Sequence, residues 1–170
     1  MGKLIGSVLC LSPAELTHAI EVGKGRSAYA LTNNCNPRNG QSVFDSEDHN
    51  IIGAIGEKAV ATFFWLPWDG DVGRPGGLDV GGYQVRSTTY ERGSMILHPE
   101  DKDEHIFILV IVDFVLTGRC RIVGWMRGSE GKQAKYWDAT KPHPAYFIPQ
   151  DELHSLPFIP RLPMRERDVE

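Results

Sequence analysis

The sequence predicts an α/β (α+β) domain in which a mixed β-sheet of about five strands is flanked by helices. Two helical patterns fall within the first 65 residues, and short extended pieces separated by glycine and proline follow them. With 41% hydrophobic and 24% charged residues, the 170-residue chain fits one globular domain, residues 1–170. The proline-rich charged segment 157–170 reads as a wrapping or frayed tail.

The first predicted helix begins at residues 12–15, "SPAE". Serine suits the N-cap, proline suits the first helical position, and glutamate three residues after the serine completes a capping box. We expect about ten helical residues, because Gly23 and Gly25 would stop the helix. Residues 31–44 are dense in Asn, Pro, Gly and Ser and predict a loop, either mobile or facing a substrate.

A second helix is predicted over residues 46–65, "SEDHNIIGAIGEKAVATFFW". Capping residues open this segment, and its apolar residues recur at helical spacing. Glu57 lies off the apolar stripe, and its neighbours one turn away are Gly53 and Ala61. This face is therefore small enough for another element to approach the Glu57 carboxylate closely.

The rest of the chain alternates extended and turn-like segments. We expect strands at 105–116, 119–126 and 145–150, and helical segments at 129–139 and 151–156. The apolar run 105–116 contains Asp113 and is shorter than the ~20 residues that span a bilayer, so we interpret it as a buried strand and expect no membrane partner.

Composition narrows the class of protein. The three cysteines are scattered and odd in number, which argues against a disulfide framework and favours a reducing, cytoplasmic compartment. A net charge of −4 argues against non-specific coating of nucleic acid but leaves a local basic cleft open. The six histidines show no HxH or HExxH spacing, so zinc chemistry is not expected.

Polar residues interrupt a strand-like pattern in residues 78–90, "LDVGGYQVRSTTY". The pair Gly81-Gly82 predicts a two-residue turn between antiparallel strands. Pairing outward from this turn sets Asp79 opposite Gln84, and strand alternation adds Arg86 to the same side. We therefore expect these three polar side chains to converge on one spot.

This side-chain set suits a magnesium site. An aspartate beside an amide oxygen offers the hard oxygen ligands that Mg²⁺ prefers, and Mg²⁺ takes only one or two carboxylates while keeping several waters. Glu57 is the candidate for the second carboxylate if its helix packs beside the hairpin. Arg86 stays protonated and cannot act as a base, but its planar fork can bind a phosphate and stabilise charge in phosphoryl transfer.

Taken in order, the segments "GAIGEKAV", "GGLDV" and "YQVRS" resemble the PD-(D/E)xK nuclease superfamily. The resemblance implies a restriction-endonuclease-like fold and a DNA nuclease that uses Mg²⁺, or Mn²⁺, to hydrolyse phosphodiester bonds. By position, it assigns Glu57 to the helix acid, Asp79 to the motif aspartate, Gln84 to the second acid and Arg86 to the lysine. The rest of the chain is similar to small phage or prophage proteins of this fold, which implies the cytoplasm of a bacterial or phage-infected host cell.

Two departures from the motif keep a second interpretation open. Gln84 removes a negative charge, and Arg86 loses the ability of lysine to handle protons. The alternative is a catalytically impaired nuclease-fold module that binds nucleic acid or a protein partner. Asp79 and Gln84 also fit an ordinary polar cross-strand pair, and Arg86 fits an ion pair with Asp71 or Glu91.

Further residues are candidates for contacts with DNA. Lys58, Arg74 and Arg92 lie close in sequence to the predicted site and are candidate phosphate contacts. The four tryptophans can stack on bases, although packing in the core or at its rim is the more usual role. Many nucleases that cut duplexes pair as dimers, so a homodimer stays open.

Overall fold

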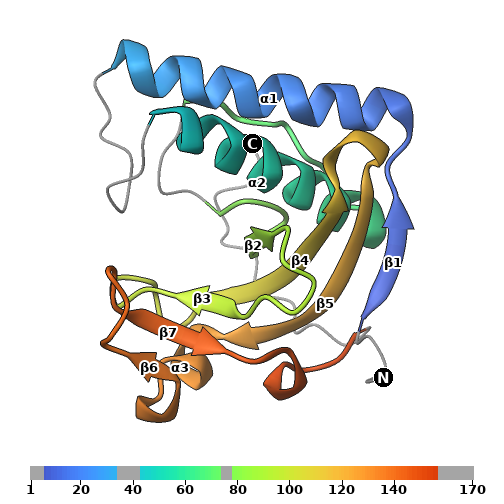
Figure 1. Cartoon of the computed structure of the whole chain (residues 1–170). Helices are drawn as coiled ribbons and strands as arrows, with labels where there is room; N and C mark the ends of the chain where they lie inside the picture. The colour runs from blue at the N-terminus through green and yellow to red at the C-terminus, as the bar shows by residue number, and fades with distance from the viewer. Residues whose placement is uncertain (1–5, 34–42, 74–77, 157–170) are drawn as a thin grey trace, which may run out of the picture.

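The computed structural model describes residues 6–33, 43–73 and 78–156. Helix α1 (Pro13–Thr32) packs on helix α2 (Val43–Phe64), and α2 packs on a four-stranded sheet. A three-stranded sheet covers the opposite face of the four-stranded one (Figure 1). The mixed helix-and-sheet class is confirmed, but the strands form two sheets and not the single sheet of about five strands that the sequence predicts.

The N-terminal end of α1 follows the predicted capping box. The Glu15 N–H donates to Ser12 Oγ at 3.3 Å, and the Ser12 N–H donates to Glu15 Oε2 at 2.9 Å. The predicted stop at Gly23 and Gly25 is wrong, because α1 continues to Thr32. A Cβ atom at Gly23 would lie 2.5 Å from Ile51 Cα of α2, so this glycine permits a close helix crossing.

The four-stranded sheet has the order β1-β5-β4-β2. Its strands are β1 (Ser7–Cys10), β2 (Gln84–Thr88), β4 (Ile106–Phe114) and β5 (Arg119–Arg127). β2 runs parallel to β4, whereas the other neighbours are antiparallel. The predicted strands at 105–116 and 119–126 are confirmed. β4 is apolar from Ile106 to Val112 because helix α2 buries one face and the second sheet buries the other.

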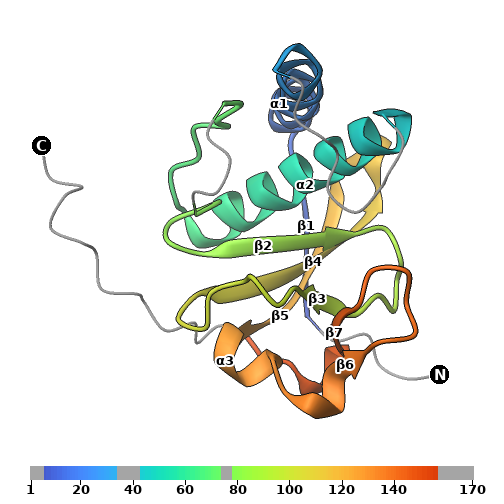
Figure 2. The same cartoon turned by 90° about the vertical axis from the view of Figure 1, so that its left-hand side faces the viewer.

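The second sheet consists of β3 (Met95–Leu97), β7 (Ala145–Ile148) and β6 (Trp137–Asp138), in that order (Figure 2). The extended segment predicted at 145–150 is confirmed over β7. The helix predicted at 129–139 is wrong beyond α3 (Gly128–Gly131), since a 3₁₀ turn and then β6 follow. Trp137 pairs with Tyr146 of β7, with ring centroids 4.9 Å apart, so tertiary pairing overrides the local helical pattern. The helix predicted at 151–156 is reduced to a 3₁₀ turn, Gln150–Glu152.

The predicted turn at Gly81-Gly82 is present. Both glycines have positive φ, +53° and +92°, and Val80 pairs with Tyr83 in an antiparallel bridge. The antiparallel pairing ends there, because β2 pairs from Gln84 onward with β4 in parallel. The predicted hairpin is therefore a single bridge that leads into the edge strand of the sheet.

Several predicted features fall outside the described residues. They include most of the predicted loop at 31–44 and the whole tail at 157–170. Within residues 6–33, 43–73 and 78–156, no helix is long and apolar enough to cross a membrane. Cys10 is exposed and Cys120 is buried, and both are free thiols.

Candidate functional site

Glu57 is a buried carboxylate held by two other segments of the chain. It is 6% exposed and lies on α2 one residue after Gly56, where a Cβ atom would lie 1.9 Å from Ser87 Oγ of β2. Arg26 of α1 donates from Nη1 to Glu57 Oε1 at 2.7 Å and from Nη2 to Oε2 at 2.8 Å. The indole N–H of Trp68 donates to Oε2 at 3.0 Å. This bidentate, charge-assisted pair fixes the plane of the carboxylate.

Asp79 lies at the start of the hairpin turn and is half-buried. Its Oδ2 accepts the Val85 N–H at 2.7 Å, and Oδ1 has no hydrogen-bond partner among the described residues. Burial and then the negative charge of Glu57 raise the pKa of Asp79 to about 6. The charge of Glu57 therefore acts on Asp79, which is consistent with the packing of α2 on β2.

Arg26 is the residue of this cluster that the sequence motif does not contain. Besides Glu57, its Nε–H donates to the Asp71 carbonyl oxygen at 3.0 Å. Burial opposes its charge, but the hydrogen bonds to Glu57 outweigh this and raise the pKa of Arg26. A signal was present in the sequence, since Arg26 falls at helical spacing on the buried stripe of α1 that includes Val22 and Gly23. A charge on such a stripe requires a buried partner.

Gln84 and Arg86 lie on the other face of the sheet, which the second sheet covers. Their register partners in β4 are Phe107 and Leu109, and these residues belong to the core between the two sheets. Gln84 is half-buried at the first position of β2. The three polar residues do not share one face, because the Asp79 carboxylate turns to the backbone of Val85. The positive charge of Arg86 still acts on Asp79 and offsets part of the rise in its pKa.

Arg86 forms an ion pair with Asp101. Its Nη2 donates to both carboxylate oxygens, at 2.8 and 2.9 Å, and its Nε donates to the Ile96 carbonyl oxygen at 3.2 Å. The guanidinium also stacks over Phe107, 4.9 Å from the ring centroid. The acid partner is therefore Asp101 and not Asp71 or Glu91.

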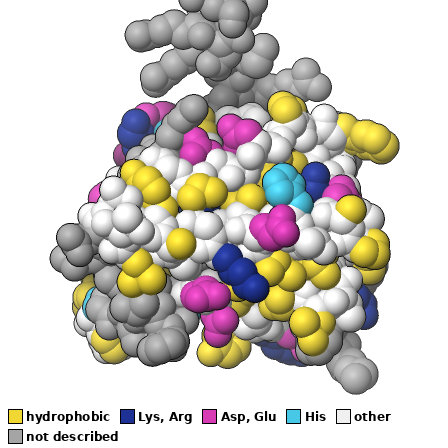
Figure 3. Space-filling model, turned by 90° about the horizontal axis from the view of Figure 1, so that it is seen from above, with side chains coloured by type: hydrophobic (Ala, Val, Ile, Leu, Met, Phe, Trp, Pro, Cys, Tyr) yellow, Lys and Arg dark blue, Asp and Glu magenta, His cyan; other side chains and the backbone are white. Residues whose placement is uncertain are grey.

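The two predicted phosphate contacts that the structure describes, Lys58 and Arg92, lie at different places. Lys58 Nζ lies 3.6 Å from Glu15 Oε1 and 5.9 Å from the Trp68 ring centroid, so it is near the Glu57 cluster. Arg92 is exposed in the turn beyond the Thr88 end of β2, away from the Gln84 end. Arg74 lies outside the described residues. In the face shown in Figure 3, the coloured Lys and Arg side chains are scattered among Asp and Glu side chains.

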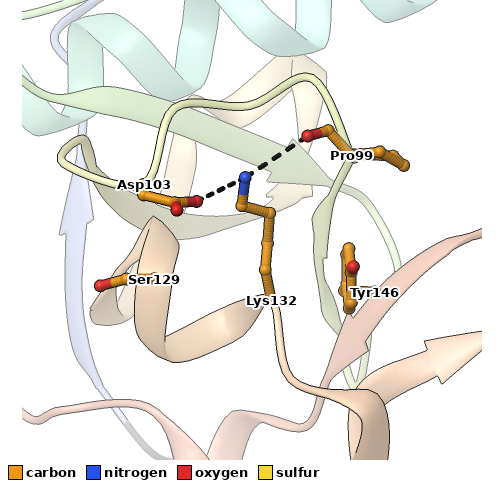
Figure 4. Close-up of a pocket in the computed structure, with 5 residues that line it drawn as sticks. All are labelled: Pro99, Asp103, Ser129, Lys132 and Tyr146. Carbon is orange, nitrogen blue, oxygen red and sulfur yellow. Dashed lines mark hydrogen bonds and ion pairs between the residues drawn. The ribbon is translucent and has the colours of Figure 1, made fainter.

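A separate pocket of about 300 Å³ lies between the segment before β4 and α3 (Figure 4). Lys132 points into it and donates to the carbonyl oxygens of Asp101, at 2.6 Å, and Pro99, at 3.4 Å, while it forms an ion pair with Asp103. These contacts use all three N–H donors of the ammonium group. Lys132 therefore braces the same segment that supplies Asp101 to Arg86, and the pocket is part of that framework.

The donor set near the hairpin is compatible with one magnesium ion. Among the described residues, no three His, Cys, Asp or Glu side chains form a group that could hold a metal ion. Mg²⁺ needs only one or two carboxylates, because waters complete its coordination. Asp79 offers an oxygen with no hydrogen bond from the described residues, with Glu57 as its carboxylate neighbour, whereas Gln84 starts from the other face of the sheet at the first position of β2.

Comparison of the chain with protein-family models, curated proteins and solved structures found no match.

Proposed function

We propose that this protein is a metal-dependent DNA nuclease that hydrolyses phosphodiester bonds, with Asp79 and Glu57 as the carboxylates of its site. The supporting observation is that these two carboxylates are electrostatic neighbours in a place partly withdrawn from water. Like charges so placed disfavour each other, and a divalent cation between them relieves the repulsion. The order of the three motif segments in the chain supports the same function.

Each residue has a part in this proposal. Asp79 offers the open carboxylate oxygen, and its bond to the Val85 N–H orients it. Glu57 adds the second carboxylate. Gln84, the first residue of the edge strand β2, adds its amide oxygen by turning around the sheet edge toward Asp79. Mg²⁺ or Mn²⁺, when bound, supplies a water of lowered pKa and polarises the scissile phosphate. Arg86, held by Asp101, contributes a fixed positive charge but no proton transfer.

One observation favours a second candidate, a catalytically impaired module that binds nucleic acid or a protein partner. Both arginines near Asp79 are already paired with carboxylates, Arg26 with Glu57 and Arg86 with Asp101. Paired charges attract a cation or a phosphate less strongly than free ones. A site of this kind retains the fold while chemistry is slow or absent.

Incubation with linear, circular and single-stranded DNA in Mg²⁺ or Mn²⁺ separates the two candidates. We expect cleavage by the native protein and its loss in Asp79→Ala, with Asp151→Ala as an exposed control. Cleavage that survives Asp79→Ala rejects the site. Salt-dependent DNA binding without cleavage favours the binding module, and the absence of both binding and cleavage rejects both candidates.

A further inference from the structure

Arg26 occupies a position that no part of the motif assigns. We propose that Arg26 is a cation built into the site, which holds Glu57 in the metal-free protein and competes with a divalent cation for that carboxylate. The inference rests on the proposed function, because it concerns the same two carboxylates. According to this inference, metal binding at Glu57 is coupled to the release of the Arg26 guanidinium from that carboxylate.

The hydrogen bonds of Glu57 leave little room for a metal ion. Oε1 accepts from Arg26, and Oε2 accepts from both Arg26 and Trp68. A carboxylate has about four lone-pair sites, so only about one is left while the bidentate pair persists. Glu57 therefore cannot bind a cation through both oxygens unless Arg26 moves away.

The summed charge of the cluster also predicts competition between Arg26 and a metal ion. When both carboxylates are ionised, Glu57, Asp79 and Arg26 together carry a net charge of −1, and without Arg26 this becomes −2. The Glu57 side chain is only 8% exposed, so water screens the guanidinium charge weakly at this carboxylate. Removal of the charge of Arg26 should therefore raise the affinity for a divalent cation while it destabilises the metal-free fold.

Arg26 also has an anchor that does not depend on Glu57. Its Nε–H donates to the Asp71 carbonyl oxygen at 3.0 Å. Of its five N–H donors, the bonds to Asp71 and Glu57 use three. After exchange, the Asp71 bond retains the guanidinium beside the site, where its free N–H groups suit a phosphate oxygen.

The test compares Arg26→Gln and Arg26→Lys with the native protein. Arg119→Gln is the matched control, because Arg119 forms an exposed ion pair with Asp113 at 3.4 Å. Calorimetry measures Mn²⁺ affinity, and thermal unfolding is followed in EDTA and in saturating Mn²⁺.

We expect Arg26→Gln to bind Mn²⁺ about tenfold more tightly or better, which corresponds to about 1.4 kcal/mol. We also expect it to lose thermal stability in EDTA and to regain it with Mn²⁺. Arg119→Gln should show neither change.

The outcomes separate this inference from the proposed function. Equal Mn²⁺ affinity in the native protein and in Arg26→Gln overturns the proposed competition by Arg26 but does not contradict the proposed metal site. Failure of both proteins to bind Mn²⁺ overturns both proposals. If Arg26→Gln is unfolded in EDTA, its refolding by Mn²⁺ supports competition, and its failure to refold argues against it. Arg26→Lys keeps the charge without the fork, so it should bind Mn²⁺ less tightly than Arg26→Gln, and equal or tighter binding by Arg26→Lys contradicts competition by charge.

Discussion

Two arginine–carboxylate pairs lie on opposite faces of the same sheet. Arg26 and Glu57 join α1 to α2 on the helical side, and Arg86 and Asp101 join β2 to the segment before β4 on the other side. Both are close and partly shielded from water. They differ in their neighbours, because the charge of Glu57 acts on a second carboxylate, Asp79, whereas Asp101 accepts a backbone N–H from its own turn.

The contacts of Asp101 show what the second pair does. Its Oδ2 accepts the His98 N–H at 2.8 Å as well as the Arg86 bond, and its carbonyl oxygen accepts from Lys132. Such a carboxylate holds a turn together. The arginine that occupies the motif position is thus also a brace, whereas the arginine outside the motif directly contacts a site carboxylate.

Glu57→Ala has the largest expected effect on folding. It leaves the Arg26 guanidinium and the Trp68 indole N–H without their shared acceptor, and breaking one side of a buried pair costs about 3 to 5 kcal/mol. Since the Arg26 side chain is 23% exposed, we expect the lower part of this range in urea unfolding. Glu21→Ala, an exposed residue of α1, should change stability by about 0.5 kcal/mol or less. Equal effects of the two variants would contradict the comparison.

The pH dependence of stability tests the pair of carboxylates. The pKa of Asp79 rises from 3.8 to about 6 on folding, so the folded protein holds this proton more tightly than the unfolded chain. The protonated Asp79 therefore adds to the free energy of unfolding. This stabilisation is fully present below pH 3.8 and is lost as the pH rises through about 6. A rise of this size is worth at most about 3 kcal/mol, which solvent screening lowers to about 2 kcal/mol. Asp79→Asn should remove this pH dependence of the unfolding free energy, measured by urea unfolding in EDTA. The same pH dependence in both proteins would contradict a raised pKa of Asp79.

Asp101→Ala tests the bracing pair. We expect a loss of about 2 kcal/mol in unfolding free energy, because the Arg86 guanidinium and the His98 N–H lose an acceptor. Mn²⁺ affinity should not change, since Asp101 is not among the proposed ligands. A large change in calorimetric Mn²⁺ affinity would mean that the two pairs are not functionally distinct.

Gln84→Glu has the smallest expected effect and sharpens the ligand set. A third carboxylate near Asp79 should raise Mn²⁺ affinity about tenfold, or about 1.4 kcal/mol, if the Gln84 oxygen binds the metal directly. Gln133→Glu, at an exposed position, is the matched control. An unchanged affinity in Gln84→Glu removes Gln84 from the ligand set.

Local patterns predicted much of the fold. The capping box, the helical spacing of α2, the Gly81-Gly82 turn and the two long strands were all readable from the sequence. Gly23 was misread as a stop, because its role depends on which backbone lies against it. The division into two sheets also depends on long-range pairing, such as that of β3 with β7.

The candidate site was predictable only in part. The proximity of Glu57 to Asp79 follows from the packing of α2 beside the hairpin, which the sequence allowed but did not require. The partners of both carboxylate-bound arginines lie far away in sequence, since 31 residues separate Arg26 from Glu57. No spacing rule connects residues at that range, so the pairing of Arg26 with Glu57 and that of Arg86 with Asp101 emerged only from the folded chain.

The close crossing at Gly23 sets a minimum size for any working fragment of this protein. A piece trimmed to the three motif segments would start after α1 and would lack the guanidinium that balances Glu57. Likewise, transplanting the two carboxylates into another scaffold would require a neighbouring helix with a residue as small as glycine one turn before the arginine. The portable unit is therefore the crossed helix pair together with the hairpin.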